Sequence, residues 1–302
     1  MPVLRSRGRI HKLHESALGG HTPPPFLSVC ANPKCASGWL HVWRSRTAPV
    51  IEGGWSCSSG CTRARLTQLL RREGEQPSPS PTMHRHRIPI GLVLLEKRWV
   101  SHEELKEGLD EQRAGYSGRI GEWLVEHCGL EEARLTQALS MQWNCPIFSL
   151  KETPSEQAVS AVPRLLMEAF RFFQVRISVT GAVLYIAFED HIDHSVALAI
   201  ERITGFRVEA GLVHGSEFAS AHHAQMRARF VPTRIMEAAS MESLLEALTS
   251  LIEKEKPLDT RIVRVHDFYW LRLWKAAPEP AGPAVVPAAG VLDVLCSLAA
   301  FR

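Results

Sequence analysis

Hydrophobic residues recur at helical spacing between positions 88 and 142, and the pattern occurs twice. The first copy is an Ile-Gly pair followed by apolar residues and a glutamine: Ile90, Gly91, Leu94, Val100, Leu105, Leu109 and Gln112. The second copy lies thirty residues later: Ile120, Gly121, Leu124, Leu130, Leu135, Leu139 and Gln142. Apolar residues three and four positions apart share one face of a helix. Each copy therefore predicts a short helix, a turn and a longer amphipathic helix, in a duplicated unit.

Two local signals support this interpretation. Ser101 and Glu104 have the spacing of a capping box, which begins a helix. Gly91 and Gly121 have no Cβ atom, so that backbone or a ligand can approach closely at these positions. We therefore expect residues 88–150 to form two helical hairpins that bury their apolar stripes against each other and leave two open glycine corners.

The pattern changes after the repeat. Residues 151–230 alternate between helical and strand-like segments in the order helix, strand, strand, helix, strand, helix, which predicts a small sheet with helices on one face. The strands are expected at 175–179, 182–188 and 206–212. Residues 231–275 predict a helix at 238–255 and one strand at 262–274, which completes the sheet or pairs with a second chain. Residues 276–302 predict a linker and a short helix at 291–301.

Four of the seven cysteines form two close pairs: Cys30, Cys35, Cys57 and Cys61. Paired cysteines on turns, separated by a strand-bearing loop, hold Zn²⁺ in tetrahedral sites. We therefore expect a zinc-finger-like domain at residues 26–73 with a structural Zn²⁺, and unliganded thiols are the alternative. The odd cysteine count and the close pairing favour a metal site in a reducing compartment over a disulfide framework.

Composition limits the remaining possibilities. The 302 residues, 45% of them hydrophobic, allow two or three packed domains. A net charge of +3 is too small to indicate a polyanionic partner by itself. The chain has no apolar run of membrane-spanning length and no apolar signal segment, so we expect a cytoplasmic protein without membrane insertion. Residues 1–25 predict a flexible arm, and the Pro- and Ser-rich residues 74–87 predict a linker.

These segments together predict an α+β chain: an N-terminal zinc finger with four cysteine ligands, tandem helical hairpins and a small α/β sandwich-like subdomain. No lysine in the sequence follows a glycine, so the P-loop motif of nucleotide triphosphatases is absent. The polar residues at 189–194 could bind a metal or share protons. A solvated loop with Asp193 at the start of a helix is the favoured interpretation. We therefore expect a binding protein and not an enzyme.

From Arg119 the second copy reads Arg-Ile-Gly-x-x-Leu, with further leucines and Gln142 at fixed spacing. In this form it resembles the N-terminal domain of type II secretion and type IV pilus assembly ATPases, the GspE or MshE type, over about residues 85–230. In that family some tandem motifs bind cyclic di-GMP. The resemblance implies a nucleotide-binding set here: Ile90, Gly91, Leu94, Leu109, Gln112, Arg119, Ile120, Gly121, Leu124, Leu139 and Gln142. The first copy departs from the family pattern, because Pro89 stands where an arginine is expected and offers no guanidinium.

Three functions from different classes are open on the sequence. The first is a sensor of cyclic di-GMP in which Arg119 contacts a phosphate or a guanine face. The second is a nucleotide-free adaptor that docks to a secretion or pilus assembly protein, or to a second copy of the chain. The third is a nucleic-acid-binding regulator that uses the arginines and tryptophans of the finger. We favour this third function least, because small fingers need their aromatic residues for their own core.

Overall fold

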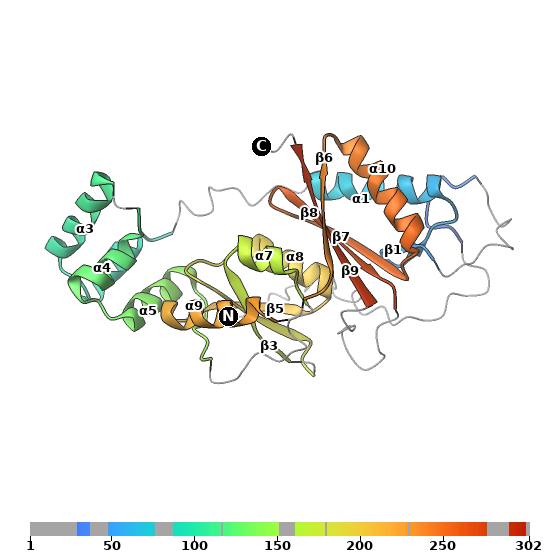
Figure 1. Ribbon diagram of the computed structural model, residues 1–302. Coiled ribbons are helices and arrows are strands. Elements are labelled where there is room, and N and C mark those ends of the chain that lie inside the picture. The colour runs from blue at the N-terminus through green and yellow to red at the C-terminus, as the bar shows by residue number, and fades with distance from the viewer. Residues whose placement is uncertain are drawn as a thin grey trace, which may run out of the picture.

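In a computed structural model the chain is elongated, with a helical repeat at one end, a small α/β unit in the middle and a helix-covered sheet at the other end (Figure 1). The structure describes residues 29–36, 48–75, 87–115, 117–150, 161–178, 180–228, 230–276 and 290–299. Three expected regions lie outside the described residues: the arm at 1–25, most of the linkers before the repeat and before residue 290, and residues 37–47 of the zinc-finger-like domain.

The predicted hairpins are confirmed. The first consists of α2 (Ile90–Glu96) and α3 (His102–Ala114), and the second of α4 (Ile120–Cys128) and α5 (Glu132–Trp143). Helix α3 begins with the predicted capping box: the Glu104 N–H donates to Ser101 Oγ at 3.2 Å, and the Ser101 N–H donates to the Glu104 carboxylate at 2.7 Å. These two bonds satisfy backbone donors that the first turn of a helix leaves free.

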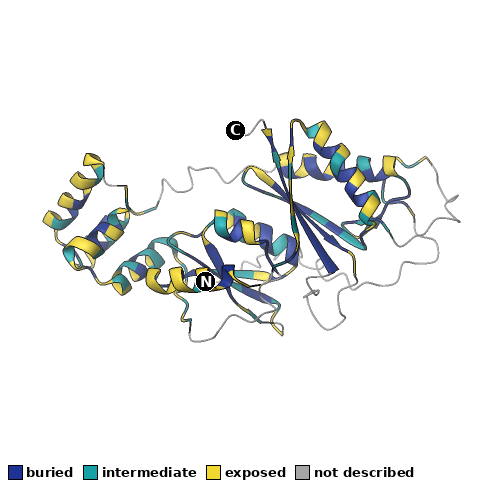
Figure 2. Ribbon diagram, in the orientation of Figure 1, coloured by how far each residue is buried: buried dark blue, intermediate teal, exposed yellow. Residues whose placement is uncertain are grey.

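The two hairpins share one core. Helix α2 packs against α5, and α3 packs against α4, so each copy contacts the other through both of its helices. The buried residues of this core come from both copies: Leu94, Val100, Leu105, Trp123, Leu124, Leu130 and Ala138. Figure 2 shows that the outward faces of these helices are mainly exposed. The repeat is therefore a small four-helix unit whose stability depends on a single apolar layer.

The middle unit follows the predicted order of elements. It contains α7 (Arg164–Ala169), β3 (Phe172–Ser178), β4 (Val183–Phe188), α8 (His194–Thr204), β5 (Arg207–Leu212) and α9 (Gly215–Met226). Strand β4 pairs with β3 in antiparallel and with β5 in parallel orientation, and α8 makes the crossover between β4 and β5. Asp193 begins α8, because its Oδ1 accepts the backbone N–H groups of Ser195 and Val196. The predicted helix cap at this position is confirmed.

The repeat contacts the middle unit through α5 and the segment that follows it. Leu139 and Trp143 on α5 pack against the core of that unit. The Glu132 carboxylate accepts bonds from the backbone N–H and the hydroxyl of Ser216, and the Phe148 N–H donates to the carbonyl of Leu212 at 2.7 Å. The second copy of the repeat is therefore docked through apolar and polar contacts.

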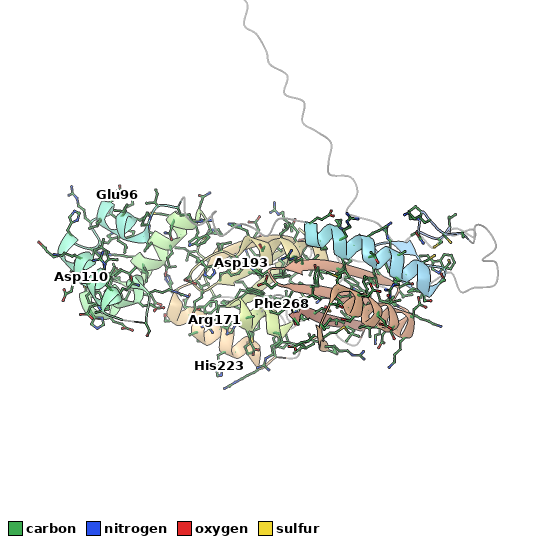
Figure 3. All side chains as sticks on the ribbon, turned by 90° about the horizontal axis from the view of Figure 1, so that it is seen from above. Glu96, Asp110, Arg171, Asp193, His223 and Phe268 are labelled. Carbon is green, nitrogen blue, oxygen red and sulfur yellow. The ribbon has the colours of Figure 1, made fainter. Side chains whose placement is uncertain are left out.

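The third unit combines segments from before the repeat and after the middle unit. Its elements are β1 (Val50–Ile51), β2 (Gly54–Trp55), α1 (Ser59–Glu75), β6 (Thr233–Ala238), α10 (Met241–Glu255), β7 (Asp259–Val265), β8 (Phe268–Trp274) and β9 (Val291–Leu298). The last four strands form a sheet in the order β6-β9-β8-β7. Helix α1 lies beside α10 over this sheet (Figures 1 and 3). Ile51, Leu66 and Leu70 share one core with Leu248 and Leu271, so the cysteine-rich segment packs against the C-terminal sheet.

Two expectations for the C-terminal region are wrong. The single strand expected at 262–274 is a hairpin of β7 and β8, which turns at His266 with a φ of 51°. The helix expected at 291–301 is strand β9, which lies between β6 and β8 and is almost entirely buried. A strand covered on both faces is a continuous apolar run, and periodicity does not separate such a run from a buried helix. None of the described helices has both the length and the apolar character needed to cross a membrane.

Candidate functional site

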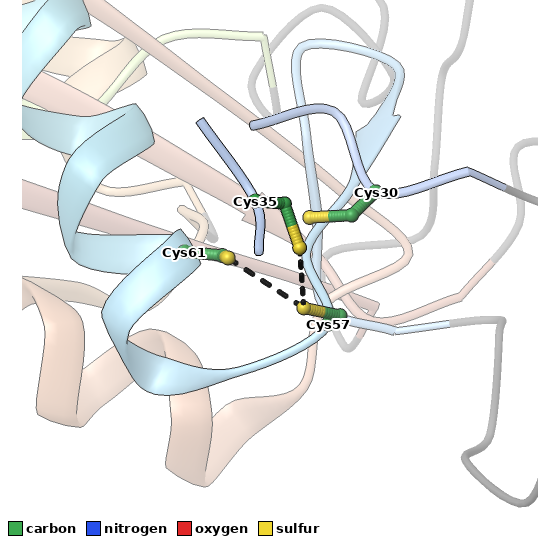
Figure 4. A group of neighbouring side chains, drawn as sticks. All are labelled: Cys30, Cys35, Cys57 and Cys61. Carbon is green, nitrogen blue, oxygen red and sulfur yellow. Dashed lines mark hydrogen bonds between the residues drawn. The ribbon is translucent and has the colours of Figure 1, made fainter. Parts of the chain in front are cut away.

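The four paired cysteines converge on one point beside the N-terminus of α1 (Figure 4). Their sulfur atoms all lie within 4.8 Å of one another, and the Cys57 sulfur lies 3.5 Å from those of Cys35 and Cys61. A tetrahedral Zn²⁺ with bonds of about 2.3 Å separates its sulfur ligands by roughly 3.8 Å. The cluster therefore has the composition and the spacing of a tetrahedral metal site.

Neighbouring groups shift the thiol pKa values of Cys57 and Cys61 in opposite directions. Burial, together with the neighbouring thiols of Cys35 and Cys61, raises the pKa of Cys57 to about 12. Burial also disfavours the Cys61 thiolate, but hydrogen bonds from Asn32, Ser58 and Cys57 outweigh it and lower the pKa of Cys61 to about 7. The Asn32 amide nitrogen donates to the Cys61 sulfur at 3.3 Å. A bound divalent cation favours thiolates over thiols, so metal binding at this cluster is coupled to proton release.

Four arginines of the finger lie in the described segments. Three of them are paired with acidic residues, whereas the Nε of the fourth, Arg65, is buried without a hydrogen-bond partner among the described residues. Arg63 contacts Glu242, Arg71 contacts Glu75 at 2.8 Å, and Arg72 contacts Glu52 at 2.6 Å. Arg44 and Arg46 lie outside the described residues. A carboxylate that is paired with a guanidinium competes with a phosphate for the same N–H groups. The described part of the finger therefore favours a structural role over nucleic-acid recognition.

The glycines of the repeat are packing positions, which corrects the expectation of open corners. Gly91 and Gly121 are each the second residue of a short helix, and both are buried. A Cβ atom at Gly91 would lie 2.9 Å from Leu105 Cδ1, and one at Gly121 would lie 2.7 Å from Leu135 Cδ1. In each copy a leucine of the long helix fills the space that the glycine leaves. A ligand cannot enter beneath these glycines without displacing core side chains.

The two glutamines occupy equivalent positions in the repeat. Gln112 Nε2 donates to the carbonyl of Gly118 at 3.3 Å, and Gln142 Nε2 donates to the carbonyl of Ile88 at 2.8 Å. Gly118 and Ile88 each lie two residues before the short helix of a copy, α4 and α2 respectively. We define the first corner as residues 87–91 beside Gln142, and the second corner as residues 118–121 beside Gln112. The glutamines hold the backbone of both corners.

The leucines and isoleucines of the motif have different surroundings. Leu94 and Leu124 are fully buried in the core of the repeat, against which Ile90 and Ile120 pack in half-buried positions. Leu139 is half-buried against the middle unit, whereas its equivalent Leu109 is 38% exposed. Most of the apolar motif residues therefore pack in the cores of the fold. The glutamines and arginines are the motif-region residues that can form hydrogen bonds or ion pairs with a ligand.

An arginine that the repeat pattern did not indicate lies at the first corner. Arg87 precedes Pro89 by two residues, its guanidinium carbon lies 3.6 Å from the ring centroid of Trp143, and its Nη1 donates to the carbonyl of Gln142. The Arg87 Nε is buried and has no hydrogen-bond partner among the described residues. A strict offset of thirty residues places Ser117 opposite Arg87, so the repeat gave no signal for it.

A chain of contacts joins the two corners. The ring of Trp143 lies 5.9 Å from the ring of His191, measured between centroids, and His191 Nδ1 lies 2.8 Å from Asp190 Oδ1. Asp190 Oδ2 in turn lies 2.8 Å from Nη1 of Arg119, whose side chain is 55% exposed. Arg119 precedes α4 as Pro89 precedes α2. The arrangement thus links two guanidinium groups through aromatic and imidazole rings.

Comparison with known proteins finds similarity to one class of protein. No family model matches the chain. The sequence is 27% identical over 121 residues to the type IV pilus assembly ATPase PilB of Myxococcus xanthus, a match that covers 40% of this chain. The chain is similar to the N-terminal domains of secretion and pilus ATPases. The match spans 21% of the length of PilB, so most of that ATPase lies outside the aligned region.

Two solved structures of this kind are also similar to the chain. MshE, in a structure with cdg, has 22% identity and a TM-score of 0.39, and the match covers 46% of this chain and 99% of that chain. The N-terminal domain of XpsE has 20% identity and a TM-score of 0.34, and the match covers 49% of this chain and 96% of that chain.

Proposed function

We propose that this chain is a non-catalytic regulatory binding module of the secretion and pilus ATPase type, that it acts in the cytoplasm, and that its helical repeat binds cyclic di-GMP. The observation that carries the proposal is the linked pair of arginines, one at each corner of a duplicated motif. Arg87 at the first corner supplies a guanidinium that Pro89 does not, so each corner has a cation.

The chemistry of the two corners matches that of a cyclic dinucleotide. Cyclic di-GMP carries two phosphates and two guanine bases, and a guanidinium binds phosphate or the guanine edge through paired N–H groups. Because Leu105 and Leu135 fill the space at the glycines, the ligand lies on the outer surface of the corners. Gln112 and Gln142 contribute by fixing the backbone that carries the arginines.

Isothermal titration with cyclic di-GMP tests this function. We expect the native chain to bind one nucleotide with micromolar affinity, and we expect Arg119→Ala and Arg87→Ala each to weaken binding about ten-fold or more, since hydrogen bonds to charged groups contribute about 1.5–3 kcal/mol. The control is Arg134→Ala on α5, because Arg134 pairs with Glu131 at 3.1 Å and takes no part in either corner. Absence of heat with the native chain, or equal affinity in Arg119→Ala, contradicts the proposal.

A second candidate function is a nucleotide-free adaptor for a secretion or pilus assembly protein. Apolar side chains of the repeat that are exposed favour it: Ile88 is 64% exposed, Leu92 55% and Met141 44%. Such residues on a small unit are typical of a protein interface. Sedimentation of the native chain with a purified pilus assembly ATPase tests this function, and Leu92→Glu should abolish co-sedimentation. Sedimentation of the chain alone as a monomer, with no association with the ATPase, contradicts the adaptor and the homodimer alike.

We also propose that the cysteine cluster holds one structural Zn²⁺. Its four thiolates would bind the ion, and the ion would join the loop at residues 30–35 to the start of α1. Backbone bonds connect the same segment to the C-terminal sheet, since the Glu52 N–H donates to the carbonyl of Thr260 at 2.8 Å. Elemental analysis of the purified chain should give one zinc per chain, and Cys57→Ser should lower that ratio. A metal-free native chain that is fully folded contradicts this assignment.

A further inference from the structure

Asp190 connects the middle unit to the repeat. It lies in the loop at residues 189–193, between β4 and α8, and its carboxylate contacts both Nη1 of Arg119 and Nδ1 of His191 at 2.8 Å. The Asp190 side chain is 22% exposed. Because Arg119 belongs to the second corner, an acidic group of one unit neutralises the cation of another.

The neighbouring acids of this loop have partners outside the repeat. Glu189 forms two hydrogen bonds of 2.8 Å with Arg171, which lies just before β3. Asp193 caps α8 and lies 2.6 Å from His266 in the turn between β7 and β8. Both ends of the loop are therefore fixed without Arg119. The contact of Asp190 with Arg119 can be exchanged while the loop stays attached to its own unit.

A phosphate that approaches Arg119 meets this carboxylate. Carboxylates and phosphates use the same N–H groups of a guanidinium, and two anions at one guanidinium repel each other. We infer that Asp190 is an internal competitor for the anion-binding site of the second corner, and that an anionic dinucleotide binds by displacing it from Arg119 and loosening the loop at 189–193 between its two fixed ends. This inference rests on the proposed function, since it names the group that regulates the same site.

The affinity of Asp190→Asn for cyclic di-GMP tests the competition. Asparagine keeps the shape of the side chain and removes its charge, so binding should become about two- to five-fold tighter, the range expected for one partly exposed ion pair. The matched control is Asp110→Asn, because Asp110 also pairs with an arginine of the repeat, Arg113, at 2.8 Å. Figure 3 places Asp110 at the outer end of the repeat, far from Asp193 of the loop. This control should bind like the native chain.

Hydrogen exchange of the loop provides the second readout. Amide exchange at residues 189–193 should become faster when nucleotide binds the native chain, and it should already be fast in Arg119→Ala without nucleotide. If the native chain binds nucleotide but Asp190→Asn binds equally or more weakly, the inference is wrong and the proposed function stands. If neither the native chain nor Asp190→Asn binds nucleotide, both are wrong. If Asp190→Asn binds nucleotide and the native chain does not, the competition by Asp190 is supported and the proposed binding by the native chain is wrong.

Discussion

Replacing Gly121 by alanine tests whether the glycines of the repeat serve packing. The new Cβ atom would lie 2.7 Å from Leu135 Cδ1 and 3.1 Å from Leu135 Cδ2, so the leucine must move. Overpacking of this kind costs about 1–3 kcal/mol. The higher helix propensity of alanine returns up to about 1 kcal/mol. We therefore expect Gly121→Ala to destabilise the repeat by roughly 1–2 kcal/mol.

Native-state hydrogen exchange at the amides of α4 and α5 is the suitable assay, because it reports the stability of the repeat separately from the other units. The control is Gly60→Ala. Gly60 is also the second residue of a helix, and a Cβ atom there would meet nothing closer than Ser58 Oγ at 3.9 Å. This control should be neutral or slightly stabilising in α1. If Gly121→Ala slows exchange in α4 and α5, the glycine is not a packing position.

Three further predictions concern the other units. Removing the metal with a strong chelator, or replacing Cys57 by serine, should lower the unfolding midpoint of the C-terminal unit, measured by circular dichroism. Replacing Arg272 by methionine leaves the fully buried carboxylate of Asp293 without its ion-pair partner at 2.7 Å and should cost about 3–5 kcal/mol in denaturant unfolding. The hydrogen bond with Asp193 raises the pKa of His266, whereas hydrogen bonds from His266 and the backbone outweigh burial and lower the pKa of Asp193. The ion pair between His266 and Asp193 therefore stabilises the fold fully between about pH 4 and about pH 6.5. This stabilisation is lost as pH rises through the raised pKa of His266. In His266→Gln the unfolding midpoint should no longer depend on pH in this way.

Local patterns predicted the repeat because its signals are local. The spacing of Leu105 and Leu109 and the capping box at Ser101 each depend on residues within one helix, and these signals agree with the final packing. The small α/β unit was predicted for the same reason, since its strands and helices are short and bounded by turns. In the small α/β unit, strands that follow one another in sequence also pair in the sheet, β3 with β4 and β4 with β5.

Long-range contacts explain what the pattern did not predict. Leu66 on α1 packs against residues that follow it by nearly two hundred positions, and no local signal joins α1 to the C-terminal sheet. The segment from Val291 to Leu298 is mostly apolar, with Asp293 and Ser297 as exceptions. It forms a strand because it lies between β6 and β8 in the sheet, which a local pattern does not indicate. The turn at His266 and Asp267 lacks glycine and proline, so a single aspartate was the local signal for this hairpin.

In the candidate site, too, local signals could be predicted and long-range contacts could not. The cysteine cluster could be predicted, because the sequence directly gives the four cysteines and the spacing between them. The position of Arg119 followed from the motif. The ion pair of Arg119 with Asp190 joins two different units, so it depends on how the repeat docks through α5. The stacking of Arg87 on Trp143 depends on the same docking. These contacts required the structure.

Native mass spectrometry of the intact chain with cyclic di-GMP tests the central claim most directly, because zinc, nucleotide and oligomeric state all register as mass. The account predicts one zinc and, at saturating nucleotide, one cyclic di-GMP per chain. At a nucleotide concentration near the dissociation constant of the native chain, nucleotide occupancy should fall strongly in Arg119→Ala and stay unchanged in Arg134→Ala. A native chain that keeps its zinc and its fold but never gains the mass of the nucleotide would contradict it.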